Sequence, residues 1–299
     1  KTMKNKNGKS PSKQYAVAGW VFIIPFIIMF AIFMVYPIFD SFYMTFFKID
    51  GFETSFVGLN NYKRLFTDSL VWKSLGNTFL YTIVQVPVML LLAMILSTLV
   101  NSHWLKLRGG FRTALFLPCV ISLVSYSLIF RMMFSNDGII NQALISLGLT
   151  SEPIGWLQTA GPARILIIIA LIWRWTGYNM MFFLSYLQNI DQATMEAAEV
   201  DGANAFQKFI RITFPQMKPI FLFCAIMTTI GTLQVFDETF NITKGNPNYS
   251  TISISHYIYN KSFVSTPDFS YSATISYLVV IILVILSIIE FRVMKEDNT

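Results

Sequence analysis

Six apolar runs, each long enough to cross a lipid bilayer, constrain what this chain can fold into. A membrane-spanning helix needs about 20 predominantly apolar residues. Charged residues make up 13% of the chain, which is about half the share that is typical of a soluble domain. The sequence therefore predicts an all-α membrane protein and argues against a soluble helical bundle. The six predicted spans cover residues 15–47, 75–100, 113–134, 163–187, 219–242 and 271–291.

The basic residues predict how these spans are oriented. Residues 1–14 are rich in lysine and carry no acidic residue, so we expect a disordered cytoplasmic tail. The first span is too long for a secretory signal and lacks a small-residue cleavage site, so we read 15–299 as one transmembrane domain. Lysines and arginines in short loops mark the cytoplasmic side. Their excess places both termini, and the loop at 191–218, in the cytoplasm.

That loop is the longest polar stretch in the second half of the chain. Asp191 is a candidate N-cap for a helix over residues 192–200. Gly202 can break this helix and turn the chain, and Pro215 is expected to end a second short helix. Two short amphipathic helices joined at a glycine would make a cytoplasmic knob. The alternative is a solvated loop that merely joins two spans.

The fourth and fifth spans hold polar and aromatic residues in unusual density. Such groups are costly in a membrane and usually face a cavity or a partner helix. Residues 173–181 read WRWTGYNMM, and Trp and Tyr combine flat apolar faces with one hydrogen-bonding group, which suits sugar rings. The alternative is an interfacial aromatic belt with Arg174 snorkelling to the surface. Residues 228–241 read TTIGTLQVFDETFN, where Asp237 and Glu238 can also bind an ion or relay protons.

Other classes of function lack their motifs in this sequence. The cysteines Cys119 and Cys224 fall in apolar segments, and the two histidines lie far apart, so we expect no metal site. The chain has no glycine-rich phosphate loop and no potassium-type selectivity filter. The net charge of +6 reflects basic residues beside the spans and not nucleic-acid binding. We therefore expect no enzymatic activity and no bound cofactor in this chain.

The loop at 191–218 resembles the signature loop of ABC importer permeases, through Glu196-Ala197-Ala198, Gly202 and the ending Ile212…Pro215. Other motifs resemble the carbohydrate branch of that superfamily, the maltose- and multiple-sugar-type permeases. Each motif is weak alone, and their order and spacing from the first span to the C-terminus carry the resemblance. These motifs are Tyr36-Pro37, Phe56-Val57-Gly58-Leu59-Asn60-Asn61-Tyr62, Asn77-Thr78, Phe111-Arg112-Thr113 before Leu117-Pro118, Gln234-Val235-Phe236-Asp237, and Gly245 with Pro247.

The resemblance implies a type I ABC importer permease fold in a bacterial plasma membrane. Two homologous permeases would form the pore for a sugar, a dimer of ATP-binding subunits would hold ATP and Mg, and an extracellular sugar-binding protein would deliver the substrate. The loop would couple to the ATPase. The matching coupling positions are Glu196, Ala197, Ala198, Asp201, Gly202, Ala203, Phe206, Phe209, Ile212 and Pro215.

The resemblance also implies positions along the sugar path. Cys119 departs from the pattern, because family members commonly have a tyrosine there, and Thr232 and Val235 replace amide side chains of the maltose system. An ion-gradient-driven secondary transporter is the alternative function. Such folds often show repeated halves, which this sequence lacks, and the cytoplasmic knob would have no role in one. The matching sugar-path positions are Cys119, Trp173, Trp175, Thr176, Gly177, Thr228, Thr232 and Val235.

Overall fold

Five helices in the described chain are long and apolar enough to cross a membrane, and a bent pair of helices can supply a sixth span. The computed structural model describes residues 11–50, 53–102 and 105–295. Most of the predicted basic tail, and His103, therefore lie outside the described residues. The expectation of a mostly helical membrane protein is confirmed. The five single spans are Ala18–Met44, Ser69–Asn101, Ala160–Leu187, Phe206–Leu233 and Phe269–Val293.

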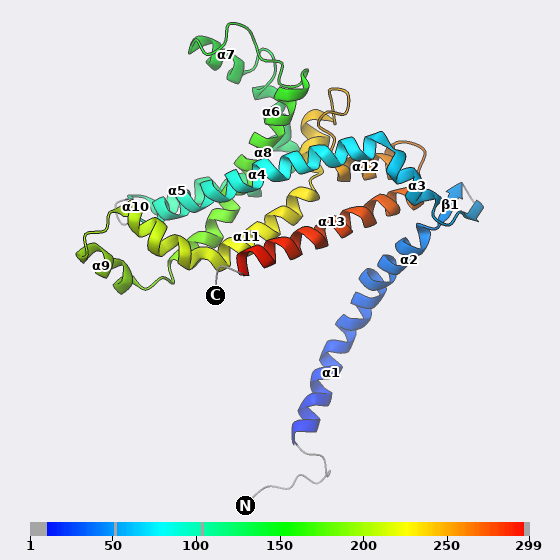
Figure 1. Ribbon diagram of the computed structural model, residues 1–299, viewed down its shortest axis with the longest axis horizontal. Helices are drawn as coiled ribbons and strands as arrows, with labels where there is room; N and C mark the ends of the chain where they lie inside the picture. The colour runs from blue at the N-terminus through cyan, green and yellow to red at the C-terminus, as the bar shows by residue number, and fades with distance from the viewer. Residues whose placement is uncertain (1–10, 51–52, 103–104, 296–299) are drawn as a thin grey trace, which may run out of the picture.

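Four long helices form the body of the molecule (Figure 1). α4 and α8 pack along each other, α11 lies against both, and α13 lies against α11. Met89, Ala93, Met180 and Phe183 are fully buried in one apolar cluster between α4 and α8. Between membrane helices, close van der Waals packing and hydrogen bonds take over from the hydrophobic effect, so this interlocked cluster holds the body together. The four helices are α4 (Ser69–Asn101), α8 (Ala160–Leu187), α11 (Phe214–Leu233) and α13 (Phe269–Lys295).

The predicted third span is not one straight helix. It consists of α5 (Arg108–Val120) and α6 (Leu123–Met133), which meet at an angle of 97°. Ile121 and Ser122 between them have extended backbone angles, and Pro118 has no N–H to give to the last turn of α5. The break leaves the final carbonyl groups of α5 without partners inside their own helix.

Most of the short elements lie at the two ends of this body, and α7 lies beyond α6 at the top of the view (Figure 1). α9 and α10 lie at one end, whereas β1, α3 and α12 lie toward the other. The short helices are α3 (Asn60–Thr67), α7 (Ile139–Ser146), α9 (Gln192–Val200), α10 (Ala205–Lys208) and α12 (Ile254–Tyr259), and the hairpin pairs β1 (Phe47–Asp50) with β2 (Glu53–Phe56). Three further π-helical turns cover Phe209–Thr213, Thr239–Thr243 and Asn260–Val264.

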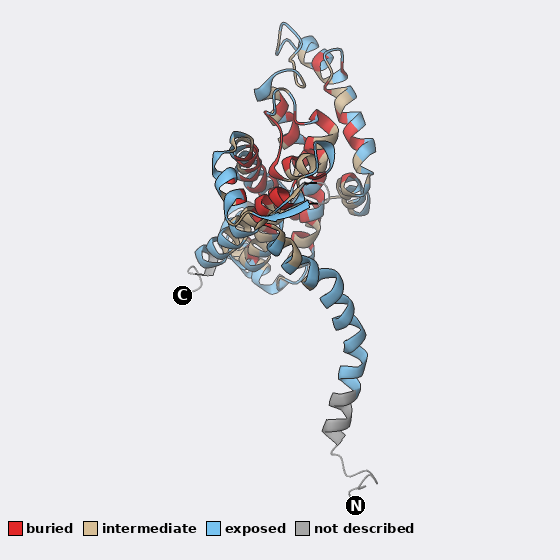
Figure 2. Ribbon diagram, turned by 90° about the vertical axis from the view of Figure 1, so that its right-hand side faces the viewer, coloured by how far each residue is buried: buried red, intermediate tan, exposed pale blue. Residues whose placement is uncertain are grey.

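The N-terminal segment leaves the body as a separate arm (Figures 1 and 2). α1 (Pro11–Phe30) continues through a π-helical turn at Ala31–Val35 into α2 (Tyr36–Met44). The most apolar 18-residue stretch of this arm has 0% of its residues buried inside the chain. The arm is thus a membrane-length helix whose sides are open to lipid or to another protein.

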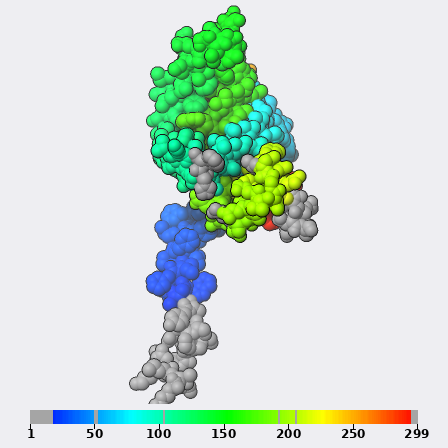
Figure 3. Space-filling view, turned by 90° about the vertical axis from the view of Figure 1, so that its left-hand side faces the viewer, coloured from blue at the N-terminus to red at the C-terminus, as the bar shows by residue number. Residues whose placement is uncertain are grey.

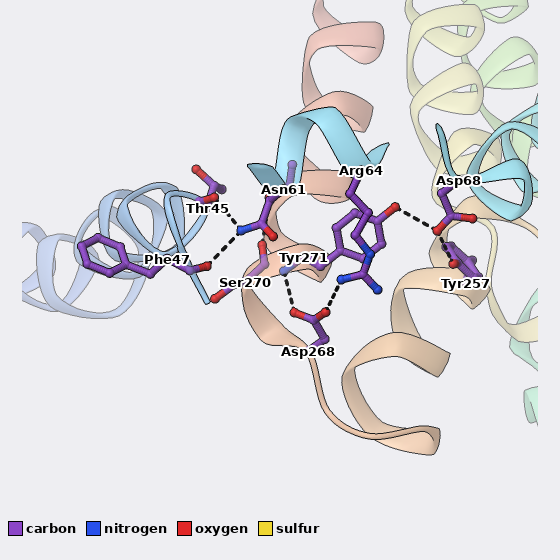
Figure 4. Close-up of polar contacts among 10 residues, drawn as sticks. Thr45, Phe47, Asn61, Arg64, Asp68, Tyr257, Asp268, Ser270 and Tyr271 are labelled. Atoms are coloured by element: carbon purple, nitrogen blue, oxygen red, sulfur yellow. Dashed lines mark hydrogen bonds and ion pairs between the residues drawn. The ribbon is translucent and has the colours of Figure 1, made fainter. Parts of the chain in front are cut away.

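Polar contacts hold the base of this arm at the end of the body that carries α3 (Figure 4). The side-chain amide of Asn61 in α3 donates to the backbone oxygens of Thr45 and Phe47 at 2.8 and 2.9 Å. The hydroxyls of Thr45 and Tyr62 lie 2.9 Å apart within hydrogen-bonding distance. Together with the contacts of Ser41 and Phe42 to Tyr277 of α13, they hold the base of the arm against the body.

A second group of contacts joins α3 to α12 and α13 (Figure 4). Arg64 Nη1 donates to Asp268 Oδ2 at 2.7 Å, and its guanidinium lies 3.9 Å from the centre of the Tyr271 ring. The hydroxyls of Tyr257 and Tyr271 donate to Asp68 Oδ2 at 2.7 and 2.9 Å. Burial by itself would raise the pKa of Asp68, but these hydrogen bonds outweigh it and lower that pKa. α3, α12 and α13 are therefore tied together at this end of the body.

The loop after α11 is also tied to the body. The side-chain amide of Asn77 donates to the carbonyls of Tyr249 and Ile252, at 3.2 and 3.0 Å. The Tyr81 hydroxyl donates to the carbonyl of Thr251 at 2.9 Å. An irregular loop that packs against the body needs such partners, because buried backbone N–H and C=O groups cannot be left unpaired.

Candidate functional site

A cavity of about 440 Å³ lies between α4, α8 and α11. Aromatic side chains from α8 and α11 line it. Trp175, Tyr178, Phe182 and Phe223 make successive ring contacts, with centroids 5.1 to 5.8 Å apart. The polar lining residues are Gln85, Arg174, Asn179, Thr228, Thr232, Gln234, Asp237 and Glu238. Flat apolar faces beside many hydrogen-bonding groups suit a ligand that has an apolar ring face and a rim of hydroxyls.

Hydrogen bonds across the cavity connect its three helices. Thr232 Oγ1 of α11 donates to Gln85 Oε1 of α4 at 2.7 Å. Thr228 Oγ1 donates to Asn179 Oδ1 of α8 at 3.3 Å, and Asn179 Nδ2 donates to the backbone oxygen of Trp175 at 3.1 Å. The cavity wall is thus built from side chains that fix one another's orientation.

Arg174 is buried beside this cavity and does not snorkel to the surface, because only 5% of it is exposed. Its guanidinium lies 4.6 Å from the centre of the Tyr126 ring and 5.5 Å from that of Trp175. Nη2 donates to the backbone oxygen of Cys119 at 3.4 Å. That oxygen belongs to the last turn of α5, where a positive charge is favoured by the helix dipole. Nε and Nη1 have no hydrogen-bond partner among the described residues.

Half of the predicted sugar-path residues line the cavity and half do not. Gly177 lies outside the cavity lining and faces α5. Its lack of a side chain makes room for the backbone of Leu115, since a Cβ there would lie 1.8 Å from the Leu115 oxygen. It therefore serves the packing of α5 on α8. The residues on the lining are Trp175, Thr228, Thr232 and Val235.

The other three predicted residues outside the lining have contacts of their own. Trp173 stacks with Tyr126 and Phe130, at centroid distances of 6.1 and 5.3 Å. Thr176 Oγ1 donates to the carbonyl of Ile172 at 2.6 Å, one turn back along α8. Cys119 contributes its backbone oxygen to Arg174. The structure thus places these residues behind the cavity wall.

Sequence reasoning missed several residues of the lining, among them Gln85, Phe182 and Phe223. Gln85 carried a signal, since it is an amide within the long apolar run of α4. Phe182 and Phe223 carried none, because a phenylalanine in a membrane helix does not reveal which way its face points.

The loop at 191–218 forms two short helices, and local hydrogen bonds explain both. Asp191 caps α9 by accepting from the Ala193 amide at 3.0 Å. α9 ends in a Schellman motif, in which Gly202 adopts a φ of 78° and Ala203 donates to the Ala198 carbonyl. A side chain at Gly202 would be strained in this left-handed conformation.

A reciprocal cap starts α10. Asn204 Oδ1 accepts from the Gln207 amide, and Gln207 Oε1 accepts from the Asn204 amide, both at 2.9 Å. An ion pair between Lys208 and Glu199 joins the two helices. The hydrogen bond from Lys208 and its charge lower the pKa of Glu199. The loop is thus a folded unit.

Pro215 does not end the second helix of this unit, contrary to expectation. α10 runs through the π-helical turn at Phe209–Thr213 directly into α11, and Pro215 lies in the first turn of α11. The helix runs on through Pro215 just after the π-helical turn, as membrane helices tolerate proline through local π adjustments. The knob is therefore rigidly continuous with a transmembrane helix.

The predicted coupling residues differ in exposure on this unit, which lies at the surface of the end shown in Figure 3. Phe206 is 74% exposed. Phe209 instead packs against the main apolar cluster of the body. Glu196, Ala197, Asp201, Gly202 and Pro215 are exposed, and Ala198, Ala203 and Ile212 are half-buried.

Comparisons with known proteins agree with one another. Residues 69–295 match the family described as binding-protein-dependent transport system inner membrane component. The lactose transport system permease protein LacF of Rhizobium radiobacter is 45% identical over 296 residues, which cover 98% of this chain and 99% of LacF. The arabinooligosaccharides transport system permease protein AraP of Bacillus subtilis (strain 168) is 34% identical, over 92% of this chain and 88% of AraP.

A solved structure shares the fold. A chain of a bacterial ABC transporter involved in the import of alginate, an acidic polysaccharide, superposes with a TM-score of 0.84 at 21% identity. The match covers 96% of this chain and 98% of that one. The bundle with its separate arm is thus the fold of an ABC importer permease.

Proposed function

Because this chain belongs to the family of binding-protein-dependent transport system inner membrane components, we propose that it forms half of the pore of an ATP-driven sugar importer. It is a multi-pass permease of the sugar ABC transporter kind and not an enzyme. The observation that carries the substrate class is the aromatic and polar cavity inside the bundle. Its volume of about 440 Å³ lies within the range of small-molecule sites.

An oligosaccharide of the size of lactose is the proposed substrate. The 45% identity to a lactose permease, over nearly the whole of both chains, supports this choice. Stacking on Trp175 and hydrogen bonds to Gln85, Asn179 and Thr228 would hold the sugar part of the way through the membrane. A separate extracellular binding protein would deliver it.

A separate pair of ATP-binding subunits would drive transport and hold ATP and Mg. The knob at 191–218 is the proposed docking element, on the cytoplasmic side together with both termini. Its folded core and the exposed Phe206 support this role. Because α10 continues into α11, a push on the knob would reach the cavity lining at Thr228 and Thr232 directly. Such a push would switch the pore between outward- and inward-facing packings.

A second, homologous permease would complete the pore. The arm of α1 and α2 supports this. Its base at α2 contacts α13, but its most apolar stretch has membrane length and none of its residues is buried, which suits it to lie against a neighbouring subunit. The contacts at the base of the arm would direct it toward that neighbour.

Reconstitution tests this function. The complex is assembled in proteoliposomes, with the binding protein on the membrane face opposite the ATPase. It should transport labelled lactose or an arabinooligosaccharide only when ATP is supplied on the ATPase side. Co-purification should recover the sister permease and the ATPase with this chain. Sugar uptake by the chain alone, driven by an ion gradient without ATP, would instead favour a secondary transporter.

A further inference from the structure

Arg174 lines the cavity with hydrogen-bonding capacity that the described chain leaves unused. A guanidinium has five N–H donors. The structure provides one acceptor, the Cys119 carbonyl, and Nε and Nη1 are buried without a partner. A buried charge with unpaired donors is costly unless a ligand or another group supplies acceptors. The chain tolerates this cost at the wall of its cavity.

The position of this guanidinium is fixed without any ligand. The break between α5 and α6 exposes the carbonyl end of α5, which attracts the positive charge of Arg174. The face of Tyr126 supports the guanidinium from α6. The side chain is therefore preorganised, and a ligand would not have to order it.

Two carboxylates line the same cavity. Asp237 and Glu238 follow the end of α11, and only 4% of Glu238 is exposed. Neither forms an ion pair with Arg174 in the described part of the chain. A sugar hydroxyl both accepts and donates, so it can accept from Arg174 and donate to a carboxylate. Together the three side chains carry a net formal charge of −1. A neutral sugar leaves the net charge of the site unchanged, whereas an acidic sugar makes it more negative.

We propose that Arg174, Asp237 and Glu238 form a hydroxyl-binding group that makes this permease selective for neutral saccharides against acidic ones. The inference rests on the proposed function and deepens it. Trp175 supplies the stacking face, and the three charged residues read the rim of the ring. Charge discrimination thus takes place within the membrane, in addition to any selection by a binding protein.

The first test measures binding without the binding protein. Tritiated lactose is bound to the assembled complex in lipid nanodiscs, and the variants are Arg174→Gln, Arg174→Lys and the control Arg131→Gln, an arginine outside this cavity. We expect about tenfold weaker lactose binding for Arg174→Gln, partial recovery for Arg174→Lys, and no change for the control. Unchanged binding by an assembled Arg174→Gln complex would overturn the proposal and leave Arg174 as a helix-capping residue only.

The second test reverses the selectivity and does not depend on Arg174→Gln folding. An unlabelled disaccharide with one C6 carboxylate competes against tritiated lactose. It should compete poorly in the wild type and about tenfold better in Asp237→Asn/Glu238→Gln, which leaves a net positive group. Adding Arg174→Gln to this pair should remove the gain. Equal competition in all variants would overturn the inference, whereas a wild-type complex that neither binds nor transports a neutral sugar would overturn the proposed function itself.

Discussion

Gly177 of α8 lies against Leu115 of α5 so closely that a Cβ would stand 1.8 Å from the Leu115 carbonyl oxygen and 2.5 Å from its carbon. Both obstructing atoms are backbone, so the neighbour cannot yield by a side-chain rotation. The contact joins the broken third span to the helix that carries Arg174 and Trp175. Backbone contact of this kind is how small residues bring membrane helices together.

Gly177→Ala should therefore destabilise the protein by about 3 kcal/mol or more, since overpacking must shift α5 as a whole. Thermal unfolding of the purified complex measures this. The matched control is Gly76→Ala in α4, where a Cβ would meet nothing within 4 Å in the described part of the chain. The control should be neutral or slightly stabilising, because alanine favours helix over glycine. Equal melting temperatures for both variants would contradict the contact.

Gly202→Pro should uncouple the permease from its ATPase while leaving the chain in the membrane. Gly202 has a φ of 78°, which proline cannot adopt, and its amide donates to the Glu199 carbonyl. Co-purification of the ATPase and ATP-driven sugar uptake measure the loss.

Gly148→Pro is the control for this variant. It breaks the same type of helix ending, with a φ of 70°, after α7 in a different loop. It should leave the ATPase bound. ATP-driven uptake at the wild-type rate by Gly202→Pro would count against the coupling role of the knob.

Trp175→Ala should raise the KM for the transported sugar by about tenfold with little change in assembly. Loss of one stacking face from the cavity should weaken the bound sugar on the order of 1 kcal/mol. Trp173→Ala is the matched control, since Trp173 is two residues away but packs on Tyr126 and Phe130 behind the wall. Trp173→Ala should lower the melting temperature and leave the KM nearly unchanged. If Trp173→Ala instead raised the KM and Trp175→Ala did not, Trp173 would be the residue that binds the sugar.

His256 should make the protein less stable in acid. It lies in α12, with 2% exposed, and burial lowers its pKa from 6.5 to about 4. The unfolded chain binds a proton between these values and the folded chain does not, so stability is full above pH 6.5 and falls as the pH drops toward 4. At pH 5 this costs about 2 kcal/mol.

Melting temperatures at pH 7.5 and pH 5.0 measure this effect. Phenylalanine cannot be protonated, so the difference in melting temperature between pH 7.5 and pH 5.0 should be smaller in His256→Phe than in the wild type. The same pH response in the wild type and the variant would show that other groups cause it.

The spans could be predicted because a long apolar run has few alternatives to a membrane helix. The break at Ile121–Ser122 could not, since a proline such as Pro118 is tolerated inside membrane helices and gives no clear sign of where the chain will bend. Pro215 was expected to stop a helix, but the helix runs through it from the π-helical turn at Phe209–Thr213 into α11.

The candidate site was predictable in its helices but not in its faces. Trp173 and Trp175 are two residues apart on a helix with 3.6 residues per turn, so their side chains point about 200° apart. One of them had to leave the cavity, and the sequence could not say which. The sequence also did not predict that Arg174, Asp237 and Glu238 form one group. Arg174 comes from α8 and the two carboxylates follow α11, so only packing brings them to the same cavity.

The base of the arm is held by two groups of contacts, one from Asn61 of α3 and one from Tyr277 of α13 to Ile38 and Ser41 of α2. From Ile38 to Ala18 the arm has about 20 residues and extends about 30 Å at the rise of an α-helix. A tilt of about 10° at Ile38 would carry the far end sideways by roughly 5 Å, which is about one helix turn. Small shifts at these contacts would therefore be magnified at the far end of the arm.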